Sequence, residues 1–405
     1  MIAAEGQGEL AVERAARVGA DPAGGITRLA WTAELAQVTG WVASELADLG
    51  LEPETDPAGN LIARWPAPGG PAVMAASHLD TVPSGGAYDG ALGVLCAVEA
   101  VRRLREEGFE PARPVWIGAF MDEEGARFGT ALFGSRCFAG EDMADSLNAT
   151  DRDGTTLREA ITAYGLDPQR IGAAARVHDL GAYLELHIEQ GPVLWAAGER
   201  LAVVDAIAGV LGFRVQLTGQ ANHAGTTPMD MRRDALVAGA RIAWTVRDEA
   251  RRTTGLRATV GAISVEGGTR NVVPGRCTLT VDLRVADRAA LAGAEPWLRE
   301  CVAHIAAQEG VKGEVLRDLA LDPIALDPGV AAVLEAAASD EGIQPRHMVS
   351  GAGHDAMVLA RHVPAGMIFL PSRDGVSHSP REWTPSEDCD LGARVLAGTI
   401  RRMAG

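Results

Sequence analysis

Basic side chains are in short supply in this chain, and only one of them is a lysine, Lys312. The 405 residues include 37 basic and 54 acidic side chains, which gives a formal net charge of −17. Nucleic acids and anionic membranes both require basic patches on a protein that binds them. The charge balance therefore argues against either of them as a partner.

Long apolar runs are also lacking, since none reaches the length needed to span a membrane. The N-terminal residues Met1 to Gly6 contain an early acid and no basic region followed by an apolar stretch. No secretory signal is therefore expected. These two absences favour a cytoplasmic protein.

Cysteines number only five, and no two of them form a C-x-x-C pair. Their odd number and wide spacing predict reduced thiols rather than a disulfide framework. Cys96 or Cys137 could act as a nucleophile. Because neither has a base near it in the sequence, buried and inert thiols are the favoured interpretation.

Apolar runs alternate with helical patterns in the first part of the chain. The run Pro114 to Met121 is apolar without alternation, which indicates a strand covered on both faces. Helical spacing is present from Ile26 to Leu49 and from Gly90 to Leu104. This order predicts an α/β fold with helices on both faces of a sheet.

The pattern changes in the middle of the chain to the order βαββαβ, which is typical of a ferredoxin-like sandwich. The α/β pattern resumes at Pro328. A chain of this length is also expected to form two domains. We therefore expect a discontinuous mixed-sheet catalytic domain, residues 1–203 and 318–405, and an inserted ferredoxin-like α+β domain, residues 204–317.

Three residues of the metal-ligand type, His78, Asp80 and Asp89, follow one short apolar run. His78 and Asp80 are two positions apart, so on an extended strand end their side chains point the same way. Asp80 could accept a hydrogen bond from one ring nitrogen and leave the other free for a metal. A glycine-rich turn could fold Asp89 back towards His78. Alternatively, the pair satisfies a buried strand end, which is the common role of such polar groups.

Three consecutive acids, Asp122, Glu123 and Glu124, follow the next apolar run. Burying a carboxylate there costs free energy unless a cation or a proton compensates for its charge. Neighbouring residues face opposite ways, so one glutamate could bind a metal while the other acts as a general base. The spacing does not assign the two roles, and a solvated acidic turn is the alternative interpretation.

Two further histidines lie at or beyond the ends of later predicted strands. His187 and Glu189 share a face, so either could be a metal ligand. His378 lies in a loop after the strand Gly366 to Leu370, where a lone histidine is more often structural. All of these candidates nevertheless follow strand ends, where α/β sheets place their ligands. Their convergence is typical of a two-metal hydrolase.

Two polar loops of the inserted domain could also bind a ligand. The loop Ala221 to Pro228 contains His223, and the loop Gly267 to Pro274 contains Asn271 and leads into a strand that ends at Arg284. Arginine offers a fork for a carboxylate, and asparagine offers a donor and an acceptor. From the residues alone, turn chemistry and a surface salt bridge are the favoured interpretation.

Taken together, these motifs resemble the hydantoinase/carbamoylase branch of the dinuclear amidohydrolases, which are related to carboxypeptidase G and the aminoacylases. In chain order the motifs are Ser77–Pro83, Tyr88–Gly90, Asp122–Gly125, His187–Pro192, Asn222–Gly225, Arg270–Pro274, Gly351–Asp355 and Ser377–His378. They cover nearly the whole chain in the right order. The His-Ile-Glu-Gln-Gly-Pro run distinguishes this branch from its peptidase relatives, and Trp195 departs from the acid that is frequent at its position.

The resemblance implies two divalent metal ions per subunit. His78, Asp89 and His187 would hold one ion, and Asp89, Glu124 and His378 the other, so that Asp89 bridges them. Mixed histidine and carboxylate ligands suit Zn, Mn, Co and Ni alike.

The resemblance also implies the remaining roles in the site. Glu123 would be the general base, with Asp80 supporting the site from behind the metal ligands. His223 would reach the active site of the partner subunit, which implies a homodimer formed through the inserted domain. On the substrate side, Gln190, Asn271 and Arg284 would bind the carboxylate, His223 would also contact the substrate, and the backbone around Gly353 would line the pocket.

The expected reaction is hydrolysis of the ureido C–N bond of an N-carbamoyl-L-amino acid, which gives the L-amino acid, ammonia and carbon dioxide. The same branch contains amidohydrolases of allantoate, ureidoglycolate and β-ureidopropionate, and the motifs do not separate these substrates. A non-catalytic dimer on this scaffold would be expected to lack ligands. Here every ligand and the base are present, so an enzyme with a small carboxylated ureido substrate is favoured.

Overall fold

The computed structural model describes residues 11–22 and 24–405. The N-terminal residues on which the expectation of no secretory signal rests lie outside this range. The chain divides into two compact units, one formed by the described residues up to Asp205 together with Leu326–Gly405, and the other by Ala206–Ala325. In the described part of the chain, every helix is too short or too polar to cross a membrane.

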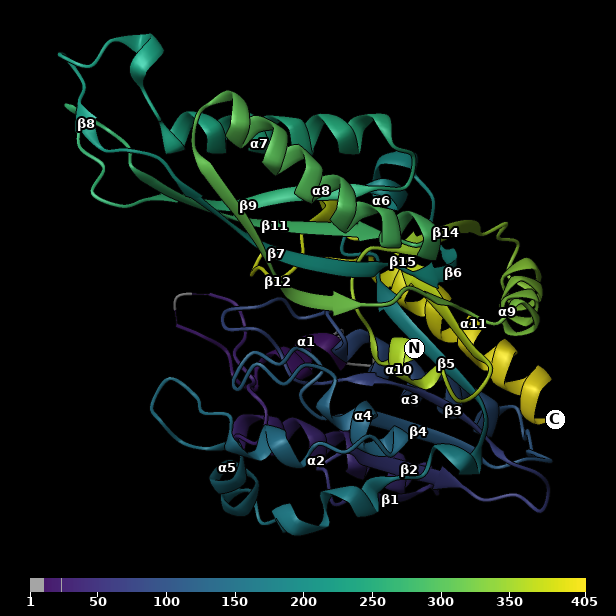
Figure 1. Ribbon diagram of the computed structural model, residues 1–405. Helices are drawn as coiled ribbons and strands as arrows, with labels where there is room; N and C mark the ends of the chain where they lie inside the picture. Colours follow the sequence, from purple (N-terminus) through teal and green to yellow (C-terminus); the bar gives the residue numbers. More distant parts are fainter. Residues whose placement is uncertain (1–10, 23) are drawn as a thin grey trace. The chain divides into compact units, whose positions relative to one another are not determined.

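The first unit is built on a mixed sheet whose strand order is β1-β2-β4-β3-β5-β15-β6-β13, with β14 paired to β6 (Figure 1). The strands are β1 (Glu52–Thr55), β2 (Leu61–Trp65), β3 (Ala72–His78), β4 (Val115–Phe120), β5 (Leu180–Ile188), β6 (Ala202–Ile207), β13 (Ile324–Ala325), β14 (Arg346–Ser350) and β15 (Ala365–Leu370). Strand β3 runs parallel to β4 and β5, and β5 runs parallel to β15. Strand β2 is antiparallel to β1 and β4, and β6 is antiparallel to β15 and β13.

Short and long helices surround this sheet. They are α1 (Ala11–Ala16), α2 (Ala33–Asp48), α3 (Ala91–Glu106), α4 (Phe133–Ala139), α5 (Leu157–Ala163), α6 (Val193–Ala197), α9 (Pro328–Asp340), α10 (Asp355–Leu359) and α11 (Ser386–Ala404). The helix expected from Ile26 begins only at Ala33, because the Thr32 side chain accepts a hydrogen bond from the Leu35 N–H and caps the helix there.

Alternation along β5 shows that helices cover both faces of the sheet. Leu184 and Leu186 point to one face and pack in the same core as the apolar residues of α3 and α11. Tyr183 points to the other face and contacts Phe120, whose ring lies 5.5 Å from that of Phe138 in α4. The predicted mixed sheet with helices on both faces is therefore confirmed.

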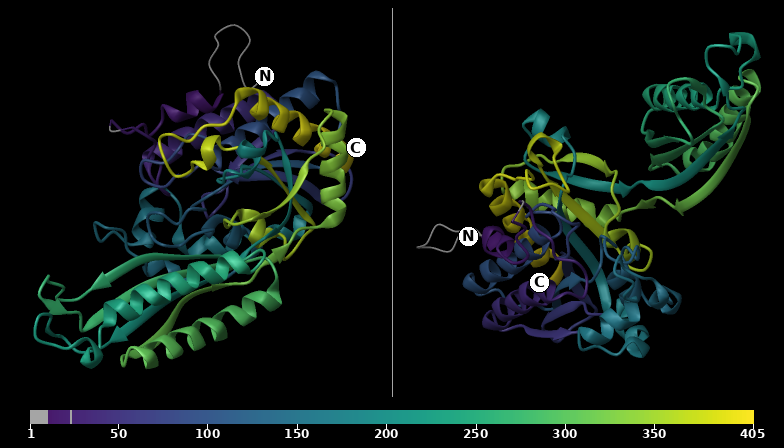
Figure 2. Two further views of the ribbon diagram at one scale, coloured as in Figure 1. Left: turned by 90° about the horizontal axis from the view of Figure 1, so that it is seen from above. Right: turned by 90° about the vertical axis from the view of Figure 1, so that its left-hand side faces the viewer.

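The second unit is an antiparallel sheet of order β12-β7-β11-β9 with two helices over one face (Figures 1 and 2). Its elements are β7 (Gly209–Thr218), α7 (Ala235–Arg252), β9 (Arg257–Val265), β11 (Arg276–Val285), α8 (Arg288–Gln308) and β12 (Lys312–Leu321). A two-stranded ribbon, β8 (Asn222–His223) with β10 (Val272–Val273), lies at one end. The chain order βαββαβ confirms the predicted ferredoxin-like fold.

Candidate active site

Four parallel strands of the first unit end at the same edge of its sheet, because β4, β3, β5 and β15 are neighbours. His78 is the last residue of β3, and His187 is the last but one of β5. The acids Asp122 to Glu124 follow β4, and His378 lies in the loop that follows β15. The carboxyl edge of the sheet therefore gathers side chains that are distant in the sequence.

The first group at this edge is His78, Asp89 and His187, whose ligand-type atoms all lie within 4.8 Å of one another. His78 Nε2 lies 3.8 Å and His187 Nε2 3.2 Å from Asp89 Oδ1. Each ring has its Nδ1 against a main-chain oxygen, that of Asp80 at 3.1 Å and that of Ile188 at 2.9 Å. These contacts orient both Nε2 atoms towards the Asp89 carboxylate.

The second group is Asp89, Glu124 and His378. His378 Nε2 lies 3.1 Å from Asp89 Oδ2 and 3.4 Å from Glu124 Oε1. The two oxygens of Asp89 thus face different groups, Oδ1 the first and Oδ2 the second. A carboxylate shared in this way can bridge two cations.

The chemistry of both groups fits divalent cations. His187 Nε2 is buried and makes no hydrogen bond of acceptable direction, although Asp89 Oδ1 is only 3.2 Å away. Burial, followed by the nearby Asp89 charge, raises the pKa of Glu124 to about 8. Burial opposes ionisation of Asp89 as well, but contacts with His187 and His378 hold its pKa well below the usual range. Buried carboxylates beside imidazole nitrogens are a stable arrangement when a cation lies between them.

The main chain is left-handed at Asp122, with φ of 58°, immediately before the two glutamates, whose side chains lie apart. Glu124 faces His378, whereas Glu123 Oε2 lies 3.6 Å from His78 Nε2 and belongs to neither group. Burial, followed by the charges of nearby acids, raises the pKa of Glu123 well above its usual range. The structure thus separates one glutamate that can bind a cation from one that can carry a proton.

Asp80 holds this turn in place. Its Oδ1 and Oδ2 accept hydrogen bonds from the N–H groups of Glu123 and Glu124, each at 3.2 Å. The sequence predicted that the Asp80 carboxylate would accept a hydrogen bond from the His78 ring. The ring nitrogen instead bonds to the Asp80 main-chain oxygen, and the carboxylate is 3.8 Å away, because the acidic turn takes both carboxylate oxygens.

Gln190 and Glu189 follow His187 and have different roles. The Gln190 side chain donates to Asp89 Oδ2 at 2.9 Å, and its buried Oε1 has no hydrogen-bond partner among the described residues. Glu189 accepts the N–H groups of Val193 and Leu194 at the start of α6, at 2.8 and 2.7 Å. Of the two candidates for a ligand, His187 is therefore in the cation groups, and Glu189 supports a helix terminus.

His354 was not singled out by the sequence reasoning, which used the Gly351–Asp355 motif only for the backbone around Gly353. Its buried ring lies 4.4 Å from the ring of His187, and its Nε2 contacts Ser350 Oγ at 2.9 Å. Gly353 itself is exposed. Only its place in the motif could have drawn attention to His354, because no spacing rule links it to His187.

The candidates in the inserted unit lie in two places: His223 and Asn271 at the β8–β10 ribbon, which leads into the start of β11, and Arg284 near the far end of that strand. His223 on β8 is in register with Val272 on β10, and the Ala224 N–H donates to the Asn271 main-chain oxygen at 2.8 Å. Arg284 on β11 holds Asp282 through two hydrogen bonds of 2.8 and 3.0 Å. The surface salt bridge that the residues alone favoured at Arg284 is therefore present.

Thiol catalysis finds no support in the site. Cys96 and Cys137 are both buried. Burial raises the pKa of the Cys137 thiol to about 12 and that of Cys96 well above its usual range. Protonated, buried thiols are inert, as the favoured interpretation of the sequence expected.

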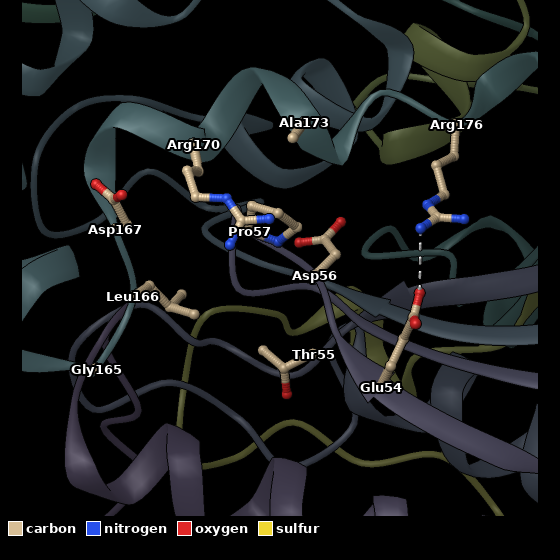
Figure 3. Close-up of a pocket in the computed structure, with 10 residues that line it drawn as sticks. All are labelled: Glu54, Thr55, Asp56, Pro57, Gly165, Leu166, Asp167, Arg170, Ala173 and Arg176. Atoms are coloured by element: carbon tan, nitrogen blue, oxygen red, sulfur yellow. Dashed lines mark ion pairs between the residues drawn. The ribbon is translucent and has the colours of Figure 1, made fainter.

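A cavity of about 410 Å³ lies elsewhere in the first unit, between the β1–β2 turn and the segment 165–176 (Figure 3). Its polar lining includes the Arg176–Glu54 pair, 3.9 Å apart, and the buried Asp56. Asp56 Oδ1 accepts the N–H groups of its own turn from Ala58 and Asn60. None of the residues in the two cation groups lines this cavity.

Metal-depleted protein should lose thermal stability as the pH rises from about 7 to about 9. The folded chain raises the pKa of Glu124 and Asp122 to about 8, from 4.5 and 3.8, and that of His187 and His378 to about 9, from 6.5. Each group holds a proton in the folded state that it lacks when unfolded, so the stability it contributes disappears as the pH passes its folded pKa.

The melting temperature of the metal-depleted protein should fall by roughly 5 °C across this window. His78 and His354, whose pKa values burial lowers, are neutral in both states there and do not oppose the trend. Scanning calorimetry at intervals between pH 7 and 9 measures the slope. Metal-loaded protein is the control and should show a smaller decline. A stability that stays constant or rises with pH in the metal-depleted protein would contradict the raised pKa values of these four groups, which come from burial at the two acids and from contact with Asp89 at the two histidines.

Comparison with known proteins agrees with this geometry. Residues 74–402 match the model of Peptidase family M20/M25/M40. N-carbamoyl-L-amino acid amidohydrolase of Geobacillus stearothermophilus is 42% identical over 96% of this chain and 95% of its own, and allantoate amidohydrolase of Bacillus subtilis is 35% identical over 97% and 96%. The crystal structure of a hydantoinase/carbamoylase family amidase from Burkholderia multivorans has a TM-score of 0.90, with 36% identity over 97% of this chain and 96% of that chain.

Proposed function

Since this chain belongs to the M20/M25/M40 peptidase family, we propose that it is a metal-dependent amidohydrolase that cleaves the ureido C–N bond of N-carbamoyl-L-amino acids. The observation that carries the proposal is the Asp89 carboxylate, whose two oxygens face two different ligand groups beside the Glu123 carboxyl. Relatives with ureido substrates in their names match nearly the whole chain, which supports the choice of bond.

Two divalent ions would bind at this edge of the sheet. One would be held by His78, Asp89 and His187, and the other by Asp89, Glu124 and His378. Imidazole and carboxylate together suit Zn, Mn, Co or Ni. When bound, such ions polarise a carbonyl group and lower the pKa of water.

Glu123 would transfer a proton from the attacking water to the nitrogen of the leaving amino acid. Its carboxylate accepts a proton from the attacking water as the water oxygen bonds to the ureido carbon. The same carboxyl then donates that proton to the amino-acid nitrogen as the C–N bond breaks. The products are the L-amino acid and a carbamic acid, which decomposes to ammonia and carbon dioxide. Asp80 keeps Glu123 in place through its main-chain N–H.

The substrate carboxylate would be bound by Gln190, Asn271 and Arg284, with the backbone around Gly353 lining the pocket. Gln190 has an unpartnered Oε1 at the ligand groups, which supports a contact with a polar substrate atom. Arg284 already binds one carboxylate, that of Asp282, through its fork. A substrate carboxylate would use the same geometry.

Arg284→Ala should raise KM for N-carbamoyl-L-amino acids by roughly 100-fold, because a bidentate charged contact is lost. Steady-state kinetics on a carboxylated substrate and on its amide analogue measures the effect. The matched control is Arg214→Ala, which removes a similar arginine paired with Asp318 in the same sheet. Unchanged turnover of carboxylated substrates in Arg284→Ala would show that the carboxylate binds elsewhere.

A homodimer through the inserted unit is also proposed. Large apolar side chains are exposed around α7 and on the edge strand β9: Met229, Met231, Leu236, Val237, Trp244 and Ile263. An apolar helix face beside an unpaired strand edge is an unfavourable surface for a free monomer. A second copy of the chain would cover it, and His223 of the partner subunit would then donate to the oxyanion formed in the reaction.

Mixed dimers test whether His223 acts across the dimer. Glu123→Gln and His223→Ala chains should each be nearly inactive, but mixing and reassociating them should restore roughly a quarter of wild-type activity. Half of the dimers are then mixed, and each has one site with both groups. Separately tagged chains purified as mixed dimers provide the measurement. Mixed dimers that stay inactive would place His223 in the site of its own subunit.

Allantoate is the alternative substrate, because allantoate amidohydrolase of Bacillus subtilis is also similar over nearly the full chain. It carries the same ureido group and a carboxylate, so the ligand groups do not separate the two reactions. Ammonia release from allantoate and from N-carbamoyl-L-methionine should be compared at equal concentration. We expect a higher kcat/KM for the carbamoyl amino acid, and a preference for allantoate would reassign the substrate.

A further inference from the structure

A buried carboxylate outside the two ligand groups, Glu382, contacts both loops that supply them. It lies in the loop after β15, four residues beyond His378. Its Oε1 accepts the N–H groups of Tyr88 at 2.8 Å and of Asp89 at 2.9 Å. Its Oε2 accepts the hydroxyl of Ser377 at 3.2 Å. One side chain therefore joins the main chain at Asp89 to the residue next to His378.

Ser377 extends this connection to the Asp89 side chain. Its Oγ lies 3.2 Å from Asp89 Oδ2, the oxygen that faces the second ligand group, and 3.2 Å from Glu382 Oε2. A hydroxyl has one proton, so it can donate to only one of the two carboxylates at a time. Glu382 thus contacts the Asp89 main chain, and the Asp89 and Glu382 carboxylates share the Ser377 hydroxyl.

The buried carboxylate of Glu382 is accommodated by hydrogen bonds and by a glycine beside it. Its hydrogen bonds run to the loops that carry ligands, and no described arginine or histidine forms an ion pair with it. A Cβ added at Gly86 would overlap the Glu382 carboxyl, so only glycine leaves room for this approach. Burying a carboxylate without a cationic partner is costly unless hydrogen bonds compensate.

The two ligand groups differ in how their histidines are held. The Nδ1 atoms of His78 and His187 bond to main-chain oxygens at strand ends. His378 instead lies in a loop, has a left-handed main chain with φ of 52°, and is 49% exposed. The second group therefore has two ligands, Asp89 and His378, whose loops Glu382 joins, whereas the first group has only Asp89.

We propose that Glu382 is a positioning residue of the second ligand group, which fixes Asp89 against the loop that carries His378 so that both can reach one ion with Glu124. The inference rests on the proposed two-metal site. The first group, His78 with His187 and Asp89, keeps two ligands that Glu382 does not touch. Loss of Glu382 should therefore weaken binding of the second ion more than binding of the first.

The test is Co²⁺ titration of metal-depleted wild-type, Glu382→Ala, Glu382→Gln and Ser377→Ala chains, followed by calorimetry and by the metal content after gel filtration. In Glu382→Ala we expect one Co²⁺ to bind with nearly wild-type affinity and the other about tenfold or more weakly. Glutamine keeps an acceptor for the Tyr88 and Asp89 N–H groups, so Glu382→Gln should recover most of the affinity. Ser377→Ala, a small change, should weaken the same ion by a lesser factor.

The matched control is Glu99→Gln, because Glu99 is also 5% exposed and lies in the same unit, paired with Arg102 and Arg103. It should bind both ions as the wild type does. Unaltered binding in both Glu382→Ala and Ser377→Ala, equal loss of both ions, or the same loss in Glu99→Gln would overturn the role of Glu382. A wild-type chain that binds no Co²⁺ would instead overturn the proposed function, and this inference with it.

In Glu382→Ala loaded with excess Co²⁺, kcat should recover towards the wild-type value, while KM should stay within about twofold throughout. The substitution should change kcat and leave KM nearly unchanged, because Glu382 positions metal ligands and does not contact the substrate carboxylate. If Glu382→Ala fails to fold, the titrations of Ser377→Ala and Glu382→Gln still test the role of Glu382. That role would be overturned if both variants bound the ion of the second group with the wild-type affinity.

Discussion

Glu123→Gln should lower kcat by about three orders of magnitude while the chain keeps its metal ions, because positioned proton transfer contributes about 10²- to 10⁴-fold. Glutamine matches glutamate in size but cannot accept a proton from water. Glu123 is 8% exposed and lies outside both ligand groups, so its amide should leave the ligands undisturbed. Steady-state turnover of an N-carbamoyl-L-amino acid and elemental analysis of the same sample measure the two effects.

Glu124→Gln is the matched comparison, because it makes the same chemical change one residue away. It should lose affinity for one ion, and added metal should restore part of its activity. The two glutamates would have exchanged roles if Glu123→Gln lost metal and Glu124→Gln kept it. Near wild-type turnover in Glu123→Gln would show that Glu123 is not the general base.

Asp89→Asn should remove both ions and reduce activity at least a thousandfold, a larger loss of metal than substitution of any other ligand causes. Each oxygen of Asp89 faces a different group, so a single substitution weakens both. Asparagine also removes one negative charge from the ligands, so less charge remains to balance the two cations. Metal content after gel filtration and ammonia release are the measurements.

Glu189→Gln serves as the control for Asp89→Asn. Glu189 shares a face of the chain with His187, but its carboxylate binds the N–H groups at the start of α6. It should therefore lower thermal stability slightly and leave the metal content unchanged. Retention of one tightly bound ion in Asp89→Asn would mean that this carboxylate does not bridge.

Much of the fold could be predicted because its buried strands are continuous apolar runs. The run Val115–Phe120 is buried throughout, and its polar neighbour Asp122 is placed at the sheet edge by the parallel arrangement. The strand β6 was not predicted, since only Ala208 separates it from β7 and the two read as one apolar stretch. Short edge strands such as β13 carry too few residues to show a period.

Residue roles at the sheet edge were harder to predict. Glu123 and Glu124 lie in a turn that begins with a left-handed main chain at Asp122 and is held by Asp80, so strand alternation could not assign their roles. The choice between His187 and Glu189 depends on where α6 begins, because its first N–H groups take the Glu189 carboxylate.

Contacts between distant loops lie outside any local pattern. Glu382 accepts a hydrogen bond from Tyr88, a residue 294 positions away, and nothing in the Arg-Glu-Trp segment around Glu382 indicates that its side chain is buried. The resemblance to a known branch supplied the ligand sets as a whole. It also supplied Asp80 as a supporting residue, but it did not supply Glu382 or Ser377.

The most direct measurement of the central claim is ammonia release from N-carbamoyl-L-amino acids before chelation, after chelation, and after each of Zn²⁺, Mn²⁺, Co²⁺ and Ni²⁺ is added back. Two ligand groups that share Asp89 predict no release without metal and full recovery only near two ions per chain. Release that survives complete removal of metal, or the absence of release from every ureido substrate with metal restored, would contradict the proposed function.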